Sequence, residues 1–279
     1  TIPESAIAFL LLLLCLLLFL RILLWFSGQK KEPASVSGCV SGASKTIGDR
    51  EVQEDVYGIK TALEGTMAVL ADGMGKRFGG KIAAGTAVEA FLQIFENGDA
   101  FYNPQYSFRR AFQGANREIL NRLEEEQGCA SVAAVMVKDR RLYYAAAGNV
   151  KVAVYRNQEL VPVTSGHTID VLARQKYEEG KLTRQEAAAL LEQHRLYNFV
   201  GQDGFCDIEF FDKPISLYGG EYILLMSDGL YETARWKDME DCLEGEGDCQ
   251  QKAYQLIELV NRSGKEDKDN AAVVVLQCR

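Results

Sequence analysis

The stretch of this sequence that most restricts the possible folds is the apolar run at residues 67–71, which ends in Asp72-Gly73. An apolar run of this length, bounded by turn-forming residues, predicts a short strand that is buried on both faces. A carboxylate at the end of a buried strand is held in place and can point into a site. Gly73 has no side chain, so another backbone segment can approach it closely. We therefore predict a functional site around Asp72.

Three other acidic junctions have the same relation to an apolar strand. They are Asp228-Gly229 after residues 222–226, Asp269-Asn270 before residues 271–276, and Gln53-Glu54-Asp55 before residues 56–59. Each junction, taken alone, is also explained by ordinary turn chemistry, in which Asp, Asn and Gly are common. Four junctions of this kind in one chain favour a shared acidic site.

A cluster of carboxylates needs a counter-charge, because each negative charge disfavours ionisation of its neighbours. The chain has only two histidines, His167 and His194, which argues against a histidine-based metal site. Carboxylate, carbonyl and water oxygens are the ligands that Mg²⁺ and Mn²⁺ prefer. We therefore predict divalent cations, and the number of carboxylates favours two metals that share a bridging water.

The distribution of charge and cysteine excludes other classes of site. The formal net charge of the 279 residues is -8. Residues 1–31 contain three basic residues and one acidic residue, so they carry +2 and the rest of the chain carries -10. Such an acidic domain lacks the basic face that nucleic-acid binding requires. The seven cysteines are odd in number and form no CxxC pair, which argues against a disulfide framework or a zinc site and favours a reducing compartment.

The N-terminal region contains a long apolar segment at residues 6–26, broken only by Arg21. As a helix, this segment would span about 31 Å, close to the thickness of a hydrocarbon core. Lys30 and Lys31 follow it, and only Glu4 flanks the other end, so the positive-inside rule places the bulk of the chain in the cytoplasm. We predict a single-pass anchor in the cell membrane over residues 1–28. A cleaved signal peptide is the alternative, although its positive n-region is missing.

The polar residues 29–44 are interpreted as a linker, and the folded domain is placed at residues 45–279. Strands are expected at residues 55–60, 66–71, 131–138, 142–147, 150–155, 222–226 and 271–276. Helices are expected at residues 80–96, 106–126, 168–179, 184–193, 236–243 and 250–262. This order predicts an α+β fold in which helices cover antiparallel sheets.

Two local features sharpen this expectation. Thr183 and Glu186 have the spacing of a capping box at a helix start. The strands between residues 131 and 155 are expected to pair consecutively and antiparallel, through turns at residues 139–141 and at Gly148-Asn149.

The acidic junctions, taken in order, resemble the motifs of a known family. The motifs are Gly48-Asp49-Arg50-Glu51-Val52-Gln53-Glu54-Asp55, Asp72-Gly73-Met74-Gly75, Ser227-Asp228-Gly229-Leu230 and Lys268-Asp269-Asn270. They are similar to four motifs of the metal-dependent, type 2C (PPM) serine/threonine protein phosphatases. Residues 164–201 also resemble the helical flap of the bacterial branch. The order and spacing match over residues 45–276.

The resemblance implies a four-layer α-β-β-α sandwich of two antiparallel sheets flanked by helices, here preceded by one transmembrane helix. It implies two divalent cations, Mn²⁺ or Mg²⁺, and hydrolysis of phosphoserine and phosphothreonine by a hydroxide that bridges them. The implied metal ligands are Asp55, Asp72, the Gly73 carbonyl, Asp228 and Asp269. Arg50, Glu54, Asp55 and Asp72 are the implied catalytic residues, with Arg50 binding the substrate phosphate and Glu54 holding a metal-bound water.

Two positions depart from the family pattern. Asn149, in Gly148-Asn149-Val150-Lys151, stands where the family has an Asp that helps to hold a third metal, so a third metal is in question. Met74 stands where many eukaryotic members have a histidine proposed as the general acid. The alternative function, which Asn149 alone supports, is a phosphatase-fold regulatory or phospho-binding protein with weak or no turnover.

The implied partners are phosphorylated cytoplasmic proteins and an opposing serine/threonine kinase, together with the membrane that holds the anchor. No nucleic-acid partner is expected. An exported metal-dependent hydrolase is a third interpretation, which applies if the apolar segment does not place the domain in the cytoplasm.

Overall fold

The computed structural model describes Arg21 and residues 39–123 and 127–278. These residues, apart from Arg21, belong to one compact unit that extends from Ser37 to Arg279. The predicted membrane anchor at residues 1–28 lies outside the described residues, except for Arg21. Among the helices that the structure does describe, none has both the length and the apolar character needed to cross a membrane.

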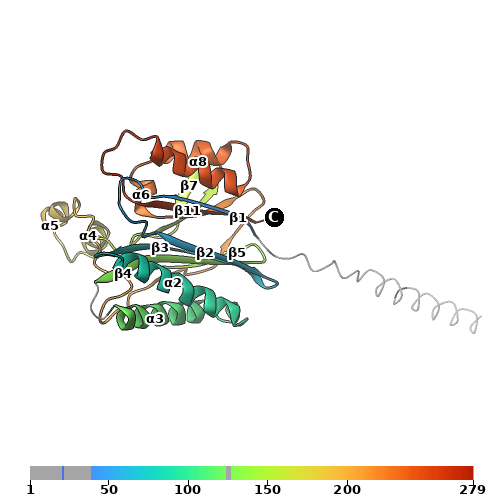
Figure 1. Cartoon of the computed structure of the whole chain (residues 1–279), viewed down its shortest axis with the longest axis horizontal. Helices are drawn as coiled ribbons and strands as arrows, with labels where there is room; N and C mark the ends of the chain where they lie inside the picture. The colour runs from blue at the N-terminus through green and yellow to red at the C-terminus, as the bar shows by residue number, and fades with distance from the viewer. Residues whose placement is uncertain (1–20, 22–38, 124–126, 279) are drawn as a thin grey trace, which may run out of the picture. The chain divides into compact units, whose positions relative to one another are not determined.

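The core of the fold is a pair of antiparallel sheets (Figure 1). The first sheet has the strand order β1 (Cys39–Thr46), β11 (Ala271–Cys278), β10 (Tyr222–Met226), β6 (Lys151–Arg156) and β7 (Glu159–Pro162). The second has the order β2 (Val56–Ala62), β3 (Gly65–Gly75), β4 (Gly128–Lys138), β5 (Arg141–Ala147) and β8 (Glu209–Phe210), and β9 (Ile215–Ser216) also pairs with β5.

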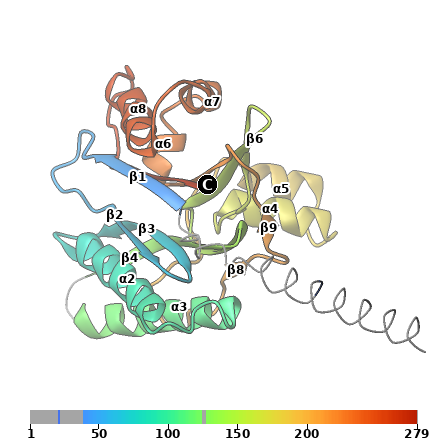
Figure 2. The same cartoon turned by 90° about the vertical axis from the view of Figure 1, so that its right-hand side faces the viewer.

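Helices cover the outer face of each sheet, as Figures 1 and 2 show from two directions. Helices α2 (Gly79–Glu96) and α3 (Pro104–Arg122) lie on the second sheet, and α6 (Asp228–Tyr231), α7 (Trp236–Glu244) and α8 (Cys249–Asn261) lie on the first. Helices α4 (Ile169–Glu178) and α5 (Arg184–Leu190) project from one end of the sandwich. The α-β-β-α architecture expected from the sequence is confirmed.

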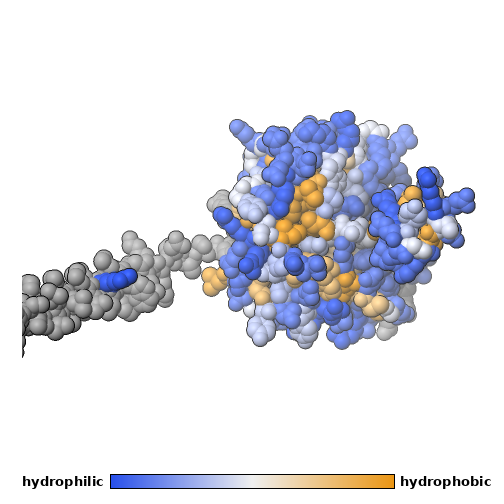
Figure 3. Space-filling view, turned by 180° about the vertical axis from the view of Figure 1, so that it is seen from behind, coloured by the Kyte–Doolittle hydropathy of each residue, from blue (hydrophilic) through white to orange (hydrophobic). Residues whose placement is uncertain are grey.

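The alternation of side chains along the central strands explains the four layers. In β3, Met67, Val69 and Ala71 pack toward α2 and α3, whereas Ala68 and Leu70 pack against the other sheet. Strand β11 likewise divides its apolar side chains between the inter-sheet core and the core under α7 and α8. Because both faces of these strands are buried, their sequences are continuous apolar runs. The outer surface seen in Figure 3 is correspondingly mostly hydrophilic, with small apolar areas.

The expected strands and helices are present, with ends shifted by a few residues, and the Thr183–Glu186 capping box forms. The linker prediction was wrong for residues 39–44, because these residues form most of β1. Its sequence of small and polar residues carries little strand character. The strand exists because all eight of its residues pair with β11.

The prediction that residues 131–155 pair consecutively was correct only for β4 and β5. Strand β6 does not continue that sheet but pairs with β10 and β7 in the other one. The crossing occurs at Gly148-Asn149, where Gly148 has φ +104° and a Cβ would lie 2.2 Å from Ser131 Oγ. Glycine is therefore required at this crossing. The crossing also places Asn149 between the two sheets.

A buried lysine supports the end of α7. Lys252 is 1% exposed, and its ammonium donates to the carbonyls of Leu243 at 2.8 Å and Gly245 at 2.6 Å. We expect Lys252→Met to lower the unfolding free energy by about 2 kcal/mol and Tm by about 5 °C, because these carbonyls lose a charged donor. Thermal unfolding measures this. The matched control is Lys237→Met on the exposed side of α7, and an equal shift in both variants would contradict the prediction.

Candidate metal centre

The four predicted acidic junctions meet at one edge of the sandwich, where segments of both sheets end. Asp55 immediately precedes β2 and Asp72 lies near the end of β3 in one sheet. Asp228 begins α6 directly after β10, and Asp269 precedes β11 in the other. Burial, and then the charges of Asp55, Asp228 and Asp269, raise the pKa of Asp72 well above its ordinary value. The four carboxylates therefore act on one another electrostatically.

Asp55 is the fully buried member of the group. Its Oδ2 accepts a hydrogen bond from the Ser227 hydroxyl at 2.8 Å, while its backbone carbonyl accepts one from Lys45 Nζ at 2.8 Å. Burial, together with the charges of Asp228 and Asp269, raises the pKa of Asp55 to about 7. Ser227 also accepts from the backbone N–H of Ala272 at 2.8 Å, which fixes the hydroxyl toward Asp55.

Asp72 and Asp228 interact through their side chains, and this interaction raises the pKa of Asp72 and lowers that of Asp228 in part. Burial raises the pKa of Asp228, and the charges of Glu232 and Asp269 raise it further. Asn149 donates from Nδ2 to Asp228 Oδ2 at 2.8 Å, which lowers this pKa in part. The amide that departs from the family pattern thus contacts one of the predicted metal ligands.

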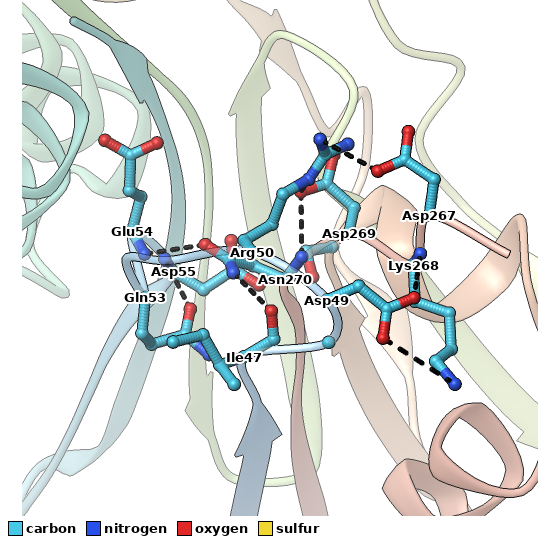
Figure 4. A network of polar contacts seen from close by, with 12 residues as sticks. Ile47, Asp49, Arg50, Gln53, Glu54, Asp55, Asp267, Lys268, Asp269 and Asn270 are labelled. Atoms are coloured by element: carbon cyan, nitrogen blue, oxygen red, sulfur yellow. Dashed lines mark hydrogen bonds and ion pairs between the residues drawn. The ribbon is translucent and has the colours of Figure 1, made fainter. Parts of the chain in front are cut away.

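Asp269 is held by Arg50 in the structure, as Figure 4 shows. Arg50 donates from Nε to Oδ1 at 3.0 Å and from a terminal nitrogen to Oδ2 at 3.3 Å, and its other terminal nitrogen lies 3.3 Å from Asp267. The guanidinium and the Asp269 side chain are each about half exposed. The residue predicted to bind phosphate and a residue predicted to bind metal therefore neutralise each other here.

Glu54 and Gly73 both lie against the N-terminus of α2. A Cβ on Gly73 would lie 2.1 Å from the Gly80 carbonyl, and one on Gly80 would lie 2.5 Å from Glu54 Oε1. Only glycine allows this close approach. Burial raises the pKa of Glu54, whereas the backbone N–H groups of Lys81 and Gly80 lower it. The helix N-terminus therefore receives the carboxylate, as its dipole favours.

The residues of the site fit the binding of cations. Buried oxygens of Glu54 (Oε1), Asp55 (Oδ1) and Asn149 (Oδ1) have no hydrogen-bond partner. Unpaired buried acceptors beside carboxylates of raised pKa form a set of hard oxygen donors that lacks positive charge. Within the described ranges, however, no three Asp, Glu, His or Cys side chains are already positioned to hold a metal ion. Since Arg50 holds Asp269, cation binding there requires this carboxylate to turn.

Two residues that support the site were not assigned a role from the sequence. Asn270 is buried, accepts the Glu54 N–H at 2.7 Å and donates to the Ile47 carbonyl at 2.8 Å. It thereby fastens the loop that carries Arg50 and Glu54 to the start of β11. Ser227 orients Asp55. Both residues directly adjoin a predicted ligand in sequence, which is the signal that could have identified them.

A groove of about 870 Å³ extends from the site toward α4. Asn149 and Tyr231 line its inner end, and the Tyr231 hydroxyl donates to the Asn149 carbonyl at 2.8 Å. His167 also lines the groove, but its Nδ1 accepts from the Gly148 N–H at 3.0 Å and burial lowers its pKa. His167 therefore serves to hold the turn between the two sheets. His194 lines the same groove and is more than half exposed.

No family model matches the chain. Sequence relatives include protein phosphatase PhpP of Streptococcus pneumoniae, which is 27% identical over 214 residues, covering 75% of this chain and 85% of the relative. The serine/threonine phosphatase of Streptococcus agalactiae has a similar structure, with a TM-score of 0.72 and 22% identity over 86% of this chain and 100% of that chain. The catalytic domain of the phosphatase PstP, described in complex with 2 manganese ions, has a TM-score of 0.65 and 22% identity over 86% of this chain and 97% of that chain.

The structural similarity shows the shared fold, and the sequence relatives are named as protein phosphatases. The chain is therefore similar in sequence to proteins named as protein phosphatases and shares the fold of solved serine/threonine phosphatases.

Proposed function

We propose that this protein is a metal-dependent serine/threonine protein phosphatase that hydrolyses phosphoserine and phosphothreonine. The observation that carries the proposal is the meeting of Asp55, Asp72, Asp228 and Asp269 at one edge of the sandwich, beside buried oxygens that lack partners. The relatives named as phosphatases support it, as does the related domain described with 2 manganese ions.

The proposed metal ligands are Asp55, Asp72, the Gly73 carbonyl, Asp228 and Asp269, and the cations are Mn²⁺ or Mg²⁺. Two bound divalent cations would lower the pKa of a water and offset the negative charge of the phosphate. Asp269 would then leave its pairing with Arg50, and the freed guanidinium can bind two phosphate oxygens at once. The unpaired Oε1 of Glu54 can accept a hydrogen bond from water beside the substrate.

Turnover of a phosphothreonine peptide and of an aryl phosphate, each with Mn²⁺, tests this proposal. Hydrolysis of both substrates that stops on chelation is the expected result. Binding of the phosphopeptide without turnover would contradict the proposed phosphatase activity and favour the phospho-binding alternative.

We further propose that residues 1–28 anchor the protein in the cell membrane, with the phosphatase domain in the cytoplasm. The apolar residues 6–26 and the lysines that follow them support this orientation. Its substrates would then be phosphorylated cytoplasmic proteins, and a serine/threonine kinase would oppose it. Reporter fusions at the C-terminus test the orientation, and activity of an exported reporter would contradict it.

The groove beside the site predicts which phosphopeptides are preferred. Its lining contains five carboxylates, of Asp170, Glu178, Asp207, Glu209 and Glu232, against the basic side chains of Lys151 and Arg174. We expect a phosphothreonine peptide with arginine beside the phosphorylated residue to have a kcat/KM about 10-fold above that of its glutamate counterpart, because the groove attracts positive charge.

Charge reversal measures how much the groove contributes to the preference for the arginine peptide over the glutamate peptide. Glu178 and Glu232 are both exposed, and Glu178→Lys with Glu232→Lys should reduce the ratio of the two peptide rates. Glu246→Lys, in the exposed turn between α7 and α8, is the matched control. An unchanged ratio in the double variant would show that the groove does not select the peptide.

A further inference from the structure

Two cysteines meet where the first and last strands of the fold lie side by side. Cys39 begins β1 and Cys278 ends β11, and the two residues are direct partners in the antiparallel register (Figure 1). Their sulfur atoms are 2.6 Å apart, although 239 positions separate them in the sequence. Directly opposed residues in an antiparallel pair have Cα atoms about 4.5–5.5 Å apart. That spacing lies within the range that a disulfide bond spans.

The surroundings hold both sulfurs in place. The Cys39 N–H donates to Thr66 Oγ1 at 3.2 Å, which ties the start of β1 to a residue of the other sheet. Cys278 is 9% exposed, and Cys39 is partly exposed. The contact with Cys39 lowers the pKa of the Cys278 thiol, burial raises it in part, and the positive charge of Arg140 lowers it further. A nearby donor and a positive charge favour the thiolate, which is the nucleophile in disulfide exchange.

We propose that Cys39 and Cys278 form a redox-sensitive disulfide that locks the edge strand β1 onto β11. The oxidant is a small-molecule disulfide. The Cys278 thiolate attacks one of its sulfurs and expels a small thiolate, which takes up a proton. Cys39 then gives up its proton and attacks the Cys278 sulfur of the mixed disulfide, and the second small thiol leaves. Two protein thiols and one small disulfide thus become one protein disulfide and two small thiols.

The bond would change the stability of the domain and leave its chemistry unaffected. Among the strands that the structure describes, β1 pairs with β11 alone, so its attachment within the sheet depends on one ladder. A bond that closes a loop of this length strongly restricts the unfolded chain. The active-site loop leaves the other end of this eight-residue strand, about 25 Å away. The expected result is therefore a higher Tm with an unchanged rate of phosphate hydrolysis.

The test treats the full-length protein with glutathione disulfide, blocks the remaining thiols, and maps peptides by mass. A linked pair of peptides containing Cys39 and Cys278, two hydrogens lighter than the reduced pair, is expected. The oxidised protein should unfold about 10 °C above the reduced protein. Aryl phosphate turnover at 25 °C should be equal in the two forms.

Three variants distinguish the Cys39–Cys278 disulfide from reactions of the other cysteines. Cys39→Ser should abolish the linked peptide and the Tm shift. Cys206→Ser, at an exposed cysteine, and Cys249→Ser, which removes a third thiol close to β1, should leave both intact. A link from Cys39 to Cys249 in the wild type would overturn the proposal. So would mixed disulfides with glutathione at Cys39 or Cys278 that never resolve to a protein disulfide.

Discussion

Asp72→Asn is expected to lower kcat/KM on a phosphothreonine peptide by roughly 10³-fold or more in the presence of Mn²⁺. The charges of Asp55, Asp228 and Asp269 all act on Asp72, so the loss of its carboxylate should affect the whole predicted centre. The amide keeps the size of the side chain but removes the negative charge. The fold should persist, because burial and the neighbouring carboxylates already disfavour the charged form of Asp72, so a neutral amide of the same size suits the site.

The measurement compares steady-state rates for the wild type and the variant, alongside far-ultraviolet circular dichroism and thermal unfolding. Asp203→Asn, in an exposed turn, is the matched control and should retain the wild-type rate. A variant that keeps more than a tenth of the wild-type kcat/KM would show that the carboxylate of Asp72 is not part of the catalytic centre.

The second large effect concerns the stability of the metal-free domain. The pKa of Asp55 is about 7 in the folded protein and near 3.8 when the chain is unfolded. The folded state therefore binds the proton more tightly, and its stabilising contribution is present below pH 4 and lost as the pH rises toward 7. The unfolding free energy that Asp55 contributes at low pH and that is lost by pH 7 is on the order of a few kcal/mol. The raised pKa values of Asp72 and Asp228 act in the same direction.

Thermal unfolding in chelator at pH 5 and pH 7, for the wild type and Asp55→Asn, measures this effect. His167 contributes the opposite slope, because burial lowers its pKa, so the informative quantity is the difference between the two proteins. We expect Asp55→Asn to gain about 10 °C in Tm relative to the wild type between pH 5 and pH 7. Parallel pH profiles for the two proteins would contradict the burial and repulsion assigned to Asp55.

Cations should reverse this loss for the wild type. Mn²⁺ supplies the positive charge that the carboxylates lack, so its effect on Tm should be larger at pH 7 than at pH 5. In Asp55→Asn the shift caused by Mn²⁺ should be much smaller at both pH values. An equal Mn²⁺ shift in the two proteins would place the cation away from this centre.

The central strands and the acidic turns could be predicted because their determinants are local. The run at residues 67–71 is apolar on every residue, since β3 is buried by α2 on one face and by the other sheet on the opposite face. Asp72-Gly73 and Asp228-Gly229 can be recognised in the sequence because each places a carboxylate and a glycine next to such a run. Strand β1 lacked this signal, because its small polar residues become a strand only through pairing with β11.

The sequence by itself determined the central strands, the four acidic junctions and the class of cation they favour, because each depends on residues that are close together in the chain. The tertiary structure decided how these junctions combine. The pairing of Arg50 with Asp269 joins residues 219 positions apart, and the bond from Asn149 to Asp228 depends on the crossing of β6 into the other sheet. The contact of Cys39 with Cys278 likewise required the first and last strands to pair. Such contacts follow from the pairing of strands that lie far apart in the chain, which no local segment determines.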